Sequence, residues 1–182
     1  MESWSLATWA IGLGALILLV GLVMLGRPDW FIRAILAFPR SRLPSWILTA
    51  ACLFWVSQIV LNAHLGRFEH LKPLIYAAGP VSFILIVVFM DELLAPRALG
   101  GLFLLVANPI LNAARWHPSN WRLVMTVIAY LIVIAGIAFV LGPYHFRKAA
   151  ALITASEKRC RVIGALRIAT GLFIMYLGLR VY

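Results

Sequence analysis

Six apolar stretches, separated by short connectors, occupy most of this 182-residue chain. A helix that crosses a bilayer needs about 20 mostly apolar residues. The stretches are 6–26, 45–63, 74–90, 98–114, 123–141 and 162–182. Hydrophobic residues make up 64% of the chain and charged residues 12%, whereas soluble domains contain about half and about a quarter. We therefore predict an all-α, multi-pass bundle of about six transmembrane helices that forms one integral membrane domain over residues 1–182.

Two arrangements fit the fourth stretch, 98–114, because it is short and contains Pro109. A proline inside a helix removes one backbone hydrogen bond and can interrupt the helix. The stretch either crosses the bilayer or enters and leaves it on the same side as a re-entrant segment. We expect a full crossing.

The basic residues divide unequally between the two sides of a six-helix arrangement. One side carries Arg27, Arg33, Arg40, Arg42, Arg97, Arg147, Lys148, Lys158, Arg159 and Arg161. The other side carries Arg67, Lys72, Arg115, Arg122 and Arg180, and Arg167 lies inside the last stretch. Cytoplasmic loops are enriched in Lys and Arg, so we place the first group in the cytoplasm and both termini outside, in a bacterial plasma (inner) membrane. The net charge of +10 then meets anionic headgroups rather than nucleic acid.

This topology predicts three consecutive out-in-out hairpins over residues 1–63, 74–114 and 123–182. Residues 25–38 and 141–153 share a Leu-Gly pair, a proline, and then aromatic, basic and aliphatic residues. The first and last hairpins therefore fit an internal duplication, although any two apolar hairpins resemble each other to some degree. Both segments are amphipathic, and such segments lie along a membrane surface. We predict short interfacial segments there.

Five basic side chains on or beside these segments are candidates for contact with lipid headgroups or a partner protein. They are Arg33, Arg40, Arg42, Arg147 and Lys148. Anchoring of each hairpin at the membrane surface is the simpler role for such residues.

Small residues recur every seven positions in three of the stretches. They are Gly14 and Gly21 in the first, Ala129 and Gly136 in the fifth, and Gly164, Gly171 and Gly178 in the sixth. This spacing keeps them on one stripe of a helix, where missing side chains let two backbones approach closely. The stripes predict close helix packing, either within the chain or against another subunit.

Four amide side chains lie inside the second and fourth stretches, as two pairs spaced i, i+4: Gln58 with Asn62, and Asn108 with Asn112. Each pair shares a helix face. An amide in hydrocarbon needs a hydrogen-bond partner, so we expect the two pairs to face each other or a cavity. The cluster is either a binding site for a quinone-like headgroup or small polar solute, or a set of hydrogen bonds between helices.

A third set, Asp91, Glu92 and Arg97, follows the third stretch. Its carboxylates are candidates for proton or ion exchange or for headgroup chemistry, and equally for capping the next helix and pairing with Arg97. The four histidines lie at helix ends or in connectors, not on inward helix faces where paired haem ligands stand. We expect no metal and no cofactor.

The chain carries no Walker loop, nucleophile elbow, zinc-protease motif or dinucleotide fingerprint. We therefore expect a non-catalytic integral membrane subunit or scaffold of a larger inner-membrane complex, with an energy-transducing assembly as one fitting class. Its partners would be anionic lipids and other membrane subunits, in a homo- or hetero-oligomer. The alternative is a small carrier or lipophilic-cofactor protein built on the four amides.

Overall fold

The computed structural model describes residues 5–64, 66–89 and 93–182, which form helices and no strands. Six of these helices are long and apolar enough to cross a membrane. They are α1 (Leu6–Gly26), α3 (Arg42–Asn62), α4 (Lys72–Phe89), α5 (Leu94–Arg115), α6 (Arg122–Leu141) and α8 (Glu157–Arg180). Shorter helices connect them: α2 (Pro28–Ala37), η1 (Phe38–Arg40), η2 (Gly66–Leu71) and α7 (Tyr144–Thr154). The all-helical prediction and its six apolar segments are confirmed.

Several helices begin earlier than the apolar stretches indicate. The last helix begins at Glu157, five residues before the predicted stretch, and the Ser156 hydroxyl accepts a hydrogen bond from the Arg159 amide at 3.4 Å. The first turn of this helix is polar, so the apolar pattern of the sequence does not mark where the helix begins. Helix α5 starts at Leu94 and runs unbroken through Pro109 for 22 residues. This length favours a full crossing over a re-entrant segment.

Helices α1 and α8 pack antiparallel through their glycine stripes. A Cβ atom on Gly14 would lie 2.9 Å from the Gly171 carbonyl oxygen, and one on Gly21 would lie 2.8 Å from the Gly164 carbonyl oxygen. At the other end of the stripe, a Cβ on Gly178 would lie 3.1 Å from the Ala7 carbonyl oxygen. Real Cβ contacts are essentially never shorter than 3.0 Å. The predicted stripes therefore meet each other within the chain.

Helices α5 and α6 form a second close pair at Gly100 and Gly136. A Cβ on Gly100 would lie 2.7 Å from the Gly136 carbonyl oxygen, and one on Gly136 would lie 2.9 Å from the Gly100 carbonyl oxygen. The predicted stripe on α6 is thus a packing surface, and Ala129 on it is fully buried. Its partner Gly100 belongs to a further seven-residue repeat of small residues, Gly100, Ala107 and Ala114, all three of which are buried and none of which was among the stripes predicted from the sequence.

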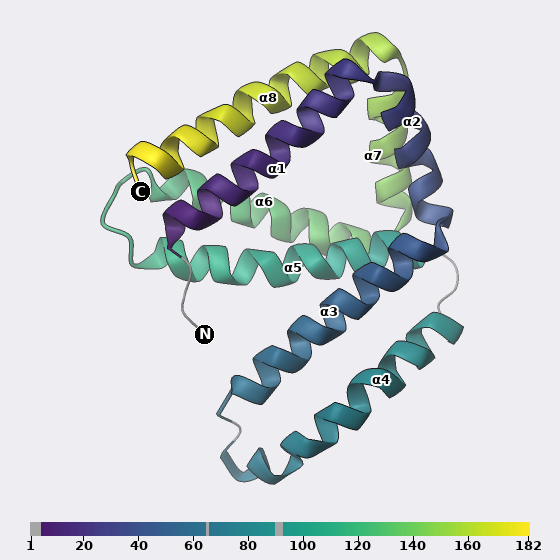
Figure 1. Ribbon diagram of the computed structural model, residues 1–182, viewed down its shortest axis with the longest axis vertical. Helices are drawn as coiled ribbons and strands as arrows, with labels where there is room; N and C mark the ends of the chain where they lie inside the picture. Colours follow the sequence, from purple (N-terminus) through teal and green to yellow (C-terminus); the bar gives the residue numbers. More distant parts are fainter. Residues whose placement is uncertain (1–4, 65, 90–92) are drawn as a thin grey trace.

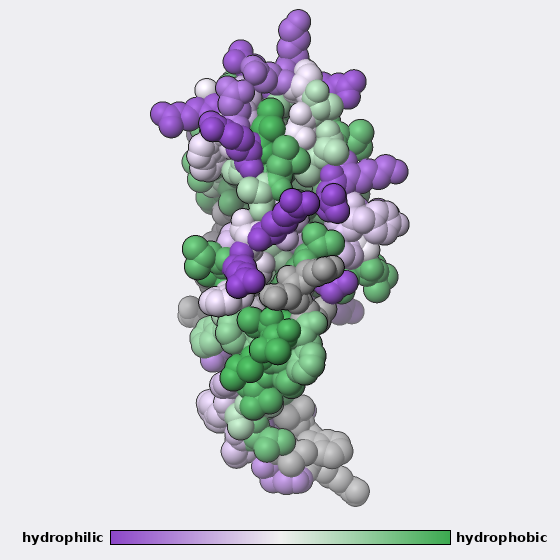
Figure 2. All heavy atoms as spheres, turned by 90° about the vertical axis from the view of Figure 1, so that its right-hand side faces the viewer, coloured by the Kyte–Doolittle hydropathy of each residue, from purple (hydrophilic) through white to green (hydrophobic). Residues whose placement is uncertain are grey.

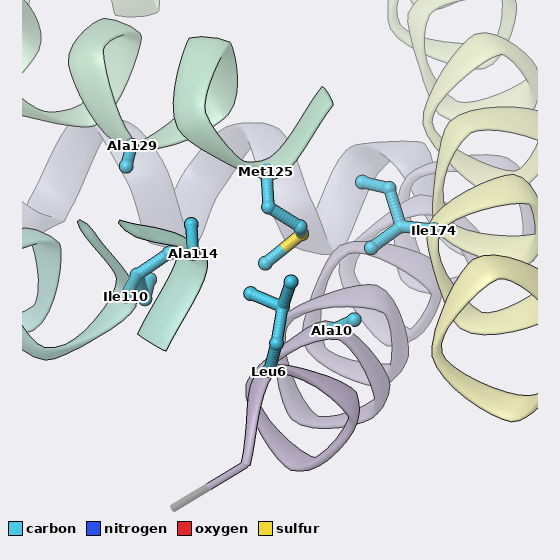
Figure 3. Close-up of a cluster of buried hydrophobic side chains, with 7 residues drawn as sticks. All are labelled: Leu6, Ala10, Ile110, Ala114, Met125, Ala129 and Ile174. Carbon is cyan, nitrogen blue, oxygen red and sulfur yellow. The ribbon is translucent and has the colours of Figure 1, made fainter. Parts of the chain in front are cut away.

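The two pairs meet in one apolar cluster (Figure 3). Its seven side chains come from all four helices: Leu6, Ala10, Ile110, Ala114, Met125, Ala129 and Ile174. Met125 and Ile110 fill the space between the pairs and are fully buried, while the alanines keep the backbones close. This cluster fixes one end of α1 and α8 against one end of α5 and α6.

Packing does not follow the three predicted hairpins. The most extensive contacts join α1 to α8 and α5 to α6, and neither pair forms the two arms of one hairpin. Helix α3 contacts α5 and α4, and α4 packs on α3 and the adjoining η2. Figure 1 shows α3 and α4 projecting away from the other four long helices. Helices α1 and α3, the two arms of the first predicted hairpin, are joined through α2 and η1 but do not pack extensively along each other.

The C-terminal residue ties the connector between α5 and α6 to the end of α8. The Tyr182 hydroxyl donates a hydrogen bond to the Trp121 carbonyl oxygen at 2.6 Å, and its ring packs edge-on against His117 at 5.3 Å. Arg122 donates to the carbonyl oxygens of Arg115 and His117 at 3.1 and 3.0 Å. Burial raises the pKa of Tyr182, so the hydroxyl stays protonated and remains a donor at neutral pH.

Candidate functional site

A groove of about 490 Å³ lies between the α2–η1 segment and α7. Arg40 stands on one wall, and Arg147 and Lys148 stand on the other with Tyr144. Ile35, Leu36, Pro39, Leu93, Ala150 and Ala151 complete the lining. We call this the basic groove. It unites three of the five basic residues predicted for headgroup or partner contact, from segments more than a hundred residues apart.

The local sequence explains how the two walls of the basic groove are held. Tyr144, Arg147 and Lys148 have the spacing i, i+3, i+4, which places them on one face of α7. Below them the Phe38 and Phe146 rings pack at 5.3 Å between centroids, joining η1 to α7. Phe146 also packs edge-on against Phe139 of α6 at 5.4 Å. These aromatic contacts join both walls to the long apolar helix α6.

The other two predicted contact residues lie outside the groove. Arg33 is exposed on α2 and donates from Nε to the Asp29 carbonyl oxygen at 3.3 Å. Arg42 is the exposed first residue of α3. Figure 2 views the side of the molecule where α2 and α7 lie, and hydrophilic side chains crowd its upper part with apolar ones between them. The groove therefore opens on a face dense in polar groups.

A second groove, of about 330 Å³, lies between α3 and α4, and we call it the α3–α4 groove. Most of its lining is apolar or small, including Ala50, Phe54 and Gly79. Ser57, Gln58 and Tyr76 also line it. A Cβ on Gly79 would lie 3.6 Å from the Ser57 hydroxyl oxygen, an ordinary contact that leaves the groove open beside it. No residue of α4 is buried.

The two amide pairs do not form one cluster. Asn62 donates to the Gln58 carbonyl oxygen at 2.7 Å, and Asn112 donates to the Asn108 side-chain oxygen at 3.2 Å, so both hydrogen bonds stay within one helix. Asn108 and Asn112 are exposed. Helices α3 and α5 touch near their first halves, where the Cys52 thiol lies 3.4 Å from the Ala98 carbonyl oxygen, and then diverge (Figure 1). The two amide pairs therefore do not face each other, and of the alternative, a cavity, the structure shows Gln58 lining the α3–α4 groove.

Packing of α5 explains this difference. Its buried stripe runs through Ala107, Ile110 and Ala114, and the last two lie in the apolar cluster with residues of α1 and α6. Asn108 lies one residue after Ala107, and Asn112 lies two residues from both Ile110 and Ala114. At these positions of a helix the side chains point away from the buried stripe. Of the four amides, Gln58 lines the α3–α4 groove.

The acidic candidates Asp91 and Glu92 lie outside the described residues. Arg97 lies in the first turn of α5 and is half-buried. Arg167 is half-buried, about 15 Å along α8 from its first residue. Neither arginine has an ion-pair partner among the described residues.

Comparison of the chain with protein-family models, with curated proteins and with solved structures finds no match.

Proposed function

We propose that this protein is a non-catalytic integral membrane subunit that receives a spanning helix of a partner protein in the α3–α4 groove. The observation that supports the proposal is the exposure of α4: among the described residues its extensive contacts are with α3 and the adjoining η2, and none of its residues is buried. Helices α1, α5, α6 and α8, by contrast, bury stripes against one another. A long helix that packs extensively on one other long helix of the described chain fits a subunit whose partner completes the packing.

Exposed apolar side chains alone do not indicate a partner, because acyl chains cover them equally well. The α3–α4 groove carries a more specific signal in Gln58, Ser57 and Gly79. Small residues let another backbone approach closely, and a side-chain amide in hydrocarbon requires a hydrogen-bond partner. The chemistry that fits is an apolar helix with a small residue opposite Gly79 and a polar side chain within reach of Gln58.

The proposed orientation in the membrane follows the three hairpins. Figure 1 shows the six long helices running between two edges, with α2 and α7 lying across their ends at the right-hand edge. That edge holds the basic residues Arg40, Arg147 and Lys148 and is the proposed cytoplasmic surface, with α2 and α7 as interfacial helices. Both termini then lie outside, in a bacterial plasma membrane. An energy-transducing complex is one assembly of this kind.

Cross-linking from a residue inside the α3–α4 groove tests whether a partner helix lies there. A photoreactive amino acid replaces Phe54, which lines the groove and is 68% exposed, and the protein is cross-linked in its native membrane. We expect a cross-link to a spanning segment of a different protein, mapped by mass spectrometry. Gly79→Leu fills the groove without a backbone clash and is expected to reduce the cross-link about tenfold, which equals about 1.4 kcal/mol.

The matched control is Ala78→Leu, on the adjacent exposed residue that does not line the groove. It adds the same type of side chain to the same helix and should leave the cross-link unchanged. Equal yields in the two variants, a cross-link to a second copy of this chain, or no cross-link at all would contradict the proposal.

A second candidate function is binding of a lipophilic cofactor in the same groove. Its volume, about 330 Å³, is at the lower end of ligand pockets, which run from about 300 to 1,000 Å³, and Gln58 and Tyr76 offer hydrogen bonds to a quinone-like carbonyl. Organic extraction of the purified protein distinguishes the two functions. A small lipophilic molecule that is retained by Ala78→Leu and lost from Gly79→Leu would favour the cofactor.

A further inference from the structure

Three cationic side chains, Arg40, Arg147 and Lys148, line the basic groove, and no carboxylate is among the lining residues that the structure describes. The ion pairs of the described residues join Lys72 to Glu69 and Arg161 to Glu157, both elsewhere. Like charges held around one cavity repel each other, and a bound anion removes that cost while each cation gains a hydrogen bond to it. The electrostatics of the groove therefore favour an anionic ligand.

The donors in the groove fit a phosphate group. Arginine presents a planar fork that matches two phosphate oxygens, and lysine adds a compact charge with three donors. The Tyr144 hydroxyl supplies a further donor on the same wall as Arg147 and Lys148. Arg40 approaches from η1 on the opposite wall, so a phosphate between the walls is contacted from both sides.

The remaining lining distinguishes a lipid from a soluble phosphate. Ile35, Leu36 and Leu93 form an apolar part of the same cavity, and a free phosphate gains nothing from it. A phospholipid places its phosphate beside the glycerol and the first acyl methylenes, which matches a cationic part next to an apolar part. Helices α2 and α7 lie across the ends of the long helices (Figure 1), and the proposed orientation in the membrane puts them at the level of the headgroups.

We propose that the basic groove is a specific binding site for an anionic phospholipid. The phosphate lies between Arg40 on one wall and Arg147 and Lys148 on the other, and the acyl chains run along Ile35 and Leu36. The site is independent of the α3–α4 groove and does not rest on the proposed function. A headgroup with two phosphates should bind more tightly than one with a single phosphate, because three cations face it.

The test measures lipid binding to the full-length protein by native mass spectrometry from neutral detergent. Cardiolipin, phosphatidylglycerol and phosphatidylcholine are titrated separately, and inorganic pyrophosphate is titrated in the absence of lipid. We expect the affinity to fall in the order cardiolipin, phosphatidylglycerol, phosphatidylcholine, with no saturable binding of pyrophosphate. Pyrophosphate binding as tight as that of cardiolipin would show a site for soluble phosphate and overturn the assignment to a lipid.

Two double variants that lose the same charge distinguish binding at the basic groove from nonspecific attraction of anionic lipid to a positively charged protein. Arg147→Gln with Lys148→Gln removes two cations from the groove and should weaken cardiolipin binding about tenfold or more, because each cation near the membrane surface contributes about a factor of five. Lys158→Gln with Arg159→Gln removes two cations from the first turn of α8, outside the groove, and should change binding less than twofold. Equal weakening in both variants, or none in either, would refute the site. The side chains of all four residues are exposed, so a thermal melt should show both variants folded.

Discussion

Replacing Gly14 by leucine is expected to separate α1 from α8, whereas the same replacement at Gly12 is expected to leave the fold intact. A Cβ at position 14 would lie 2.9 Å from both the Gly171 carbonyl oxygen and the Met175 amide nitrogen, and backbone atoms of a packed helix cannot move aside cheaply. At position 12 nothing lies within 4 Å of an added Cβ. We expect Gly14→Leu to lower the free energy of unfolding by about 3 kcal/mol, the upper part of the usual range for overpacking.

The two substitutions make a matched pair, because they add the same apolar side chain to the same turn of the same helix. Leucine at position 12 faces lipid and raises helix propensity, so it should be neutral or slightly stabilising. Reversible unfolding in lipid bicelles gives the two free energies. A loss at Gly14 no larger than that at Gly12 would mean that α1 and α8 do not approach through these glycines.

The second large effect is expected at Gly100, on the seam between α5 and α6. Gly100→Ala places a Cβ 2.7 Å from the Gly136 carbonyl oxygen and 3.0 Å from Phe139 Cβ. We expect a loss of about 2 kcal/mol in the free energy of unfolding, because the helices must move apart to admit one methyl group. The adjacent Gly101→Ala meets only the Cys52 sulfur, at 3.8 Å, which is ordinary contact.

Gly101→Ala is therefore the control, and it should be neutral or stabilising by up to about 1 kcal/mol through helix propensity. Both free energies are measured in bicelles under the same conditions. If the alanine at position 101 destabilises the protein more than the alanine at position 100, then Gly100 is not the residue at which α5 contacts α6.

The periodic parts of this fold were predictable from the sequence. Apolar length defined the six spanning helices, and the seven-residue spacing of Gly164, Gly171 and Gly178 identified the packed face of α8. A stripe specifies which face of a helix packs but not which helix it meets. The pairing of α1 with α8 joins segments from opposite ends of the chain, and no local pattern encodes it.

The candidate sites were predictable only in part for the same reason. Basic residues near a predicted membrane surface indicated headgroup contact, but the chain order did not show that Arg40 and Arg147 share a cavity. Tyr144 carried no signal beyond its spacing from Arg147 and Lys148. The i, i+4 rule correctly gave Asn108 and Asn112 a common face, but the direction of that face depends on where Ile110 and Ala114 pack. Tertiary packing decides such rotations.

If the six long helices cross the membrane as proposed, the basic helices α2 and α7 lie on one side of it. Single cysteines report this directly when a membrane-impermeant maleimide is applied to intact and permeabilised cells, in a background with Cys52 and Cys160 replaced by alanine. We predict that Ser41→Cys and Ala155→Cys, in the connectors after η1 and α7, are labelled only after permeabilisation. His64→Cys and Asn120→Cys, in the connectors at the opposite ends of the long helices, should be labelled in intact cells. Labelling of Asn120→Cys and Ala155→Cys from the same side of the membrane would contradict the crossings of α6, and labelling of Ser41→Cys and His64→Cys from the same side would contradict that of α3.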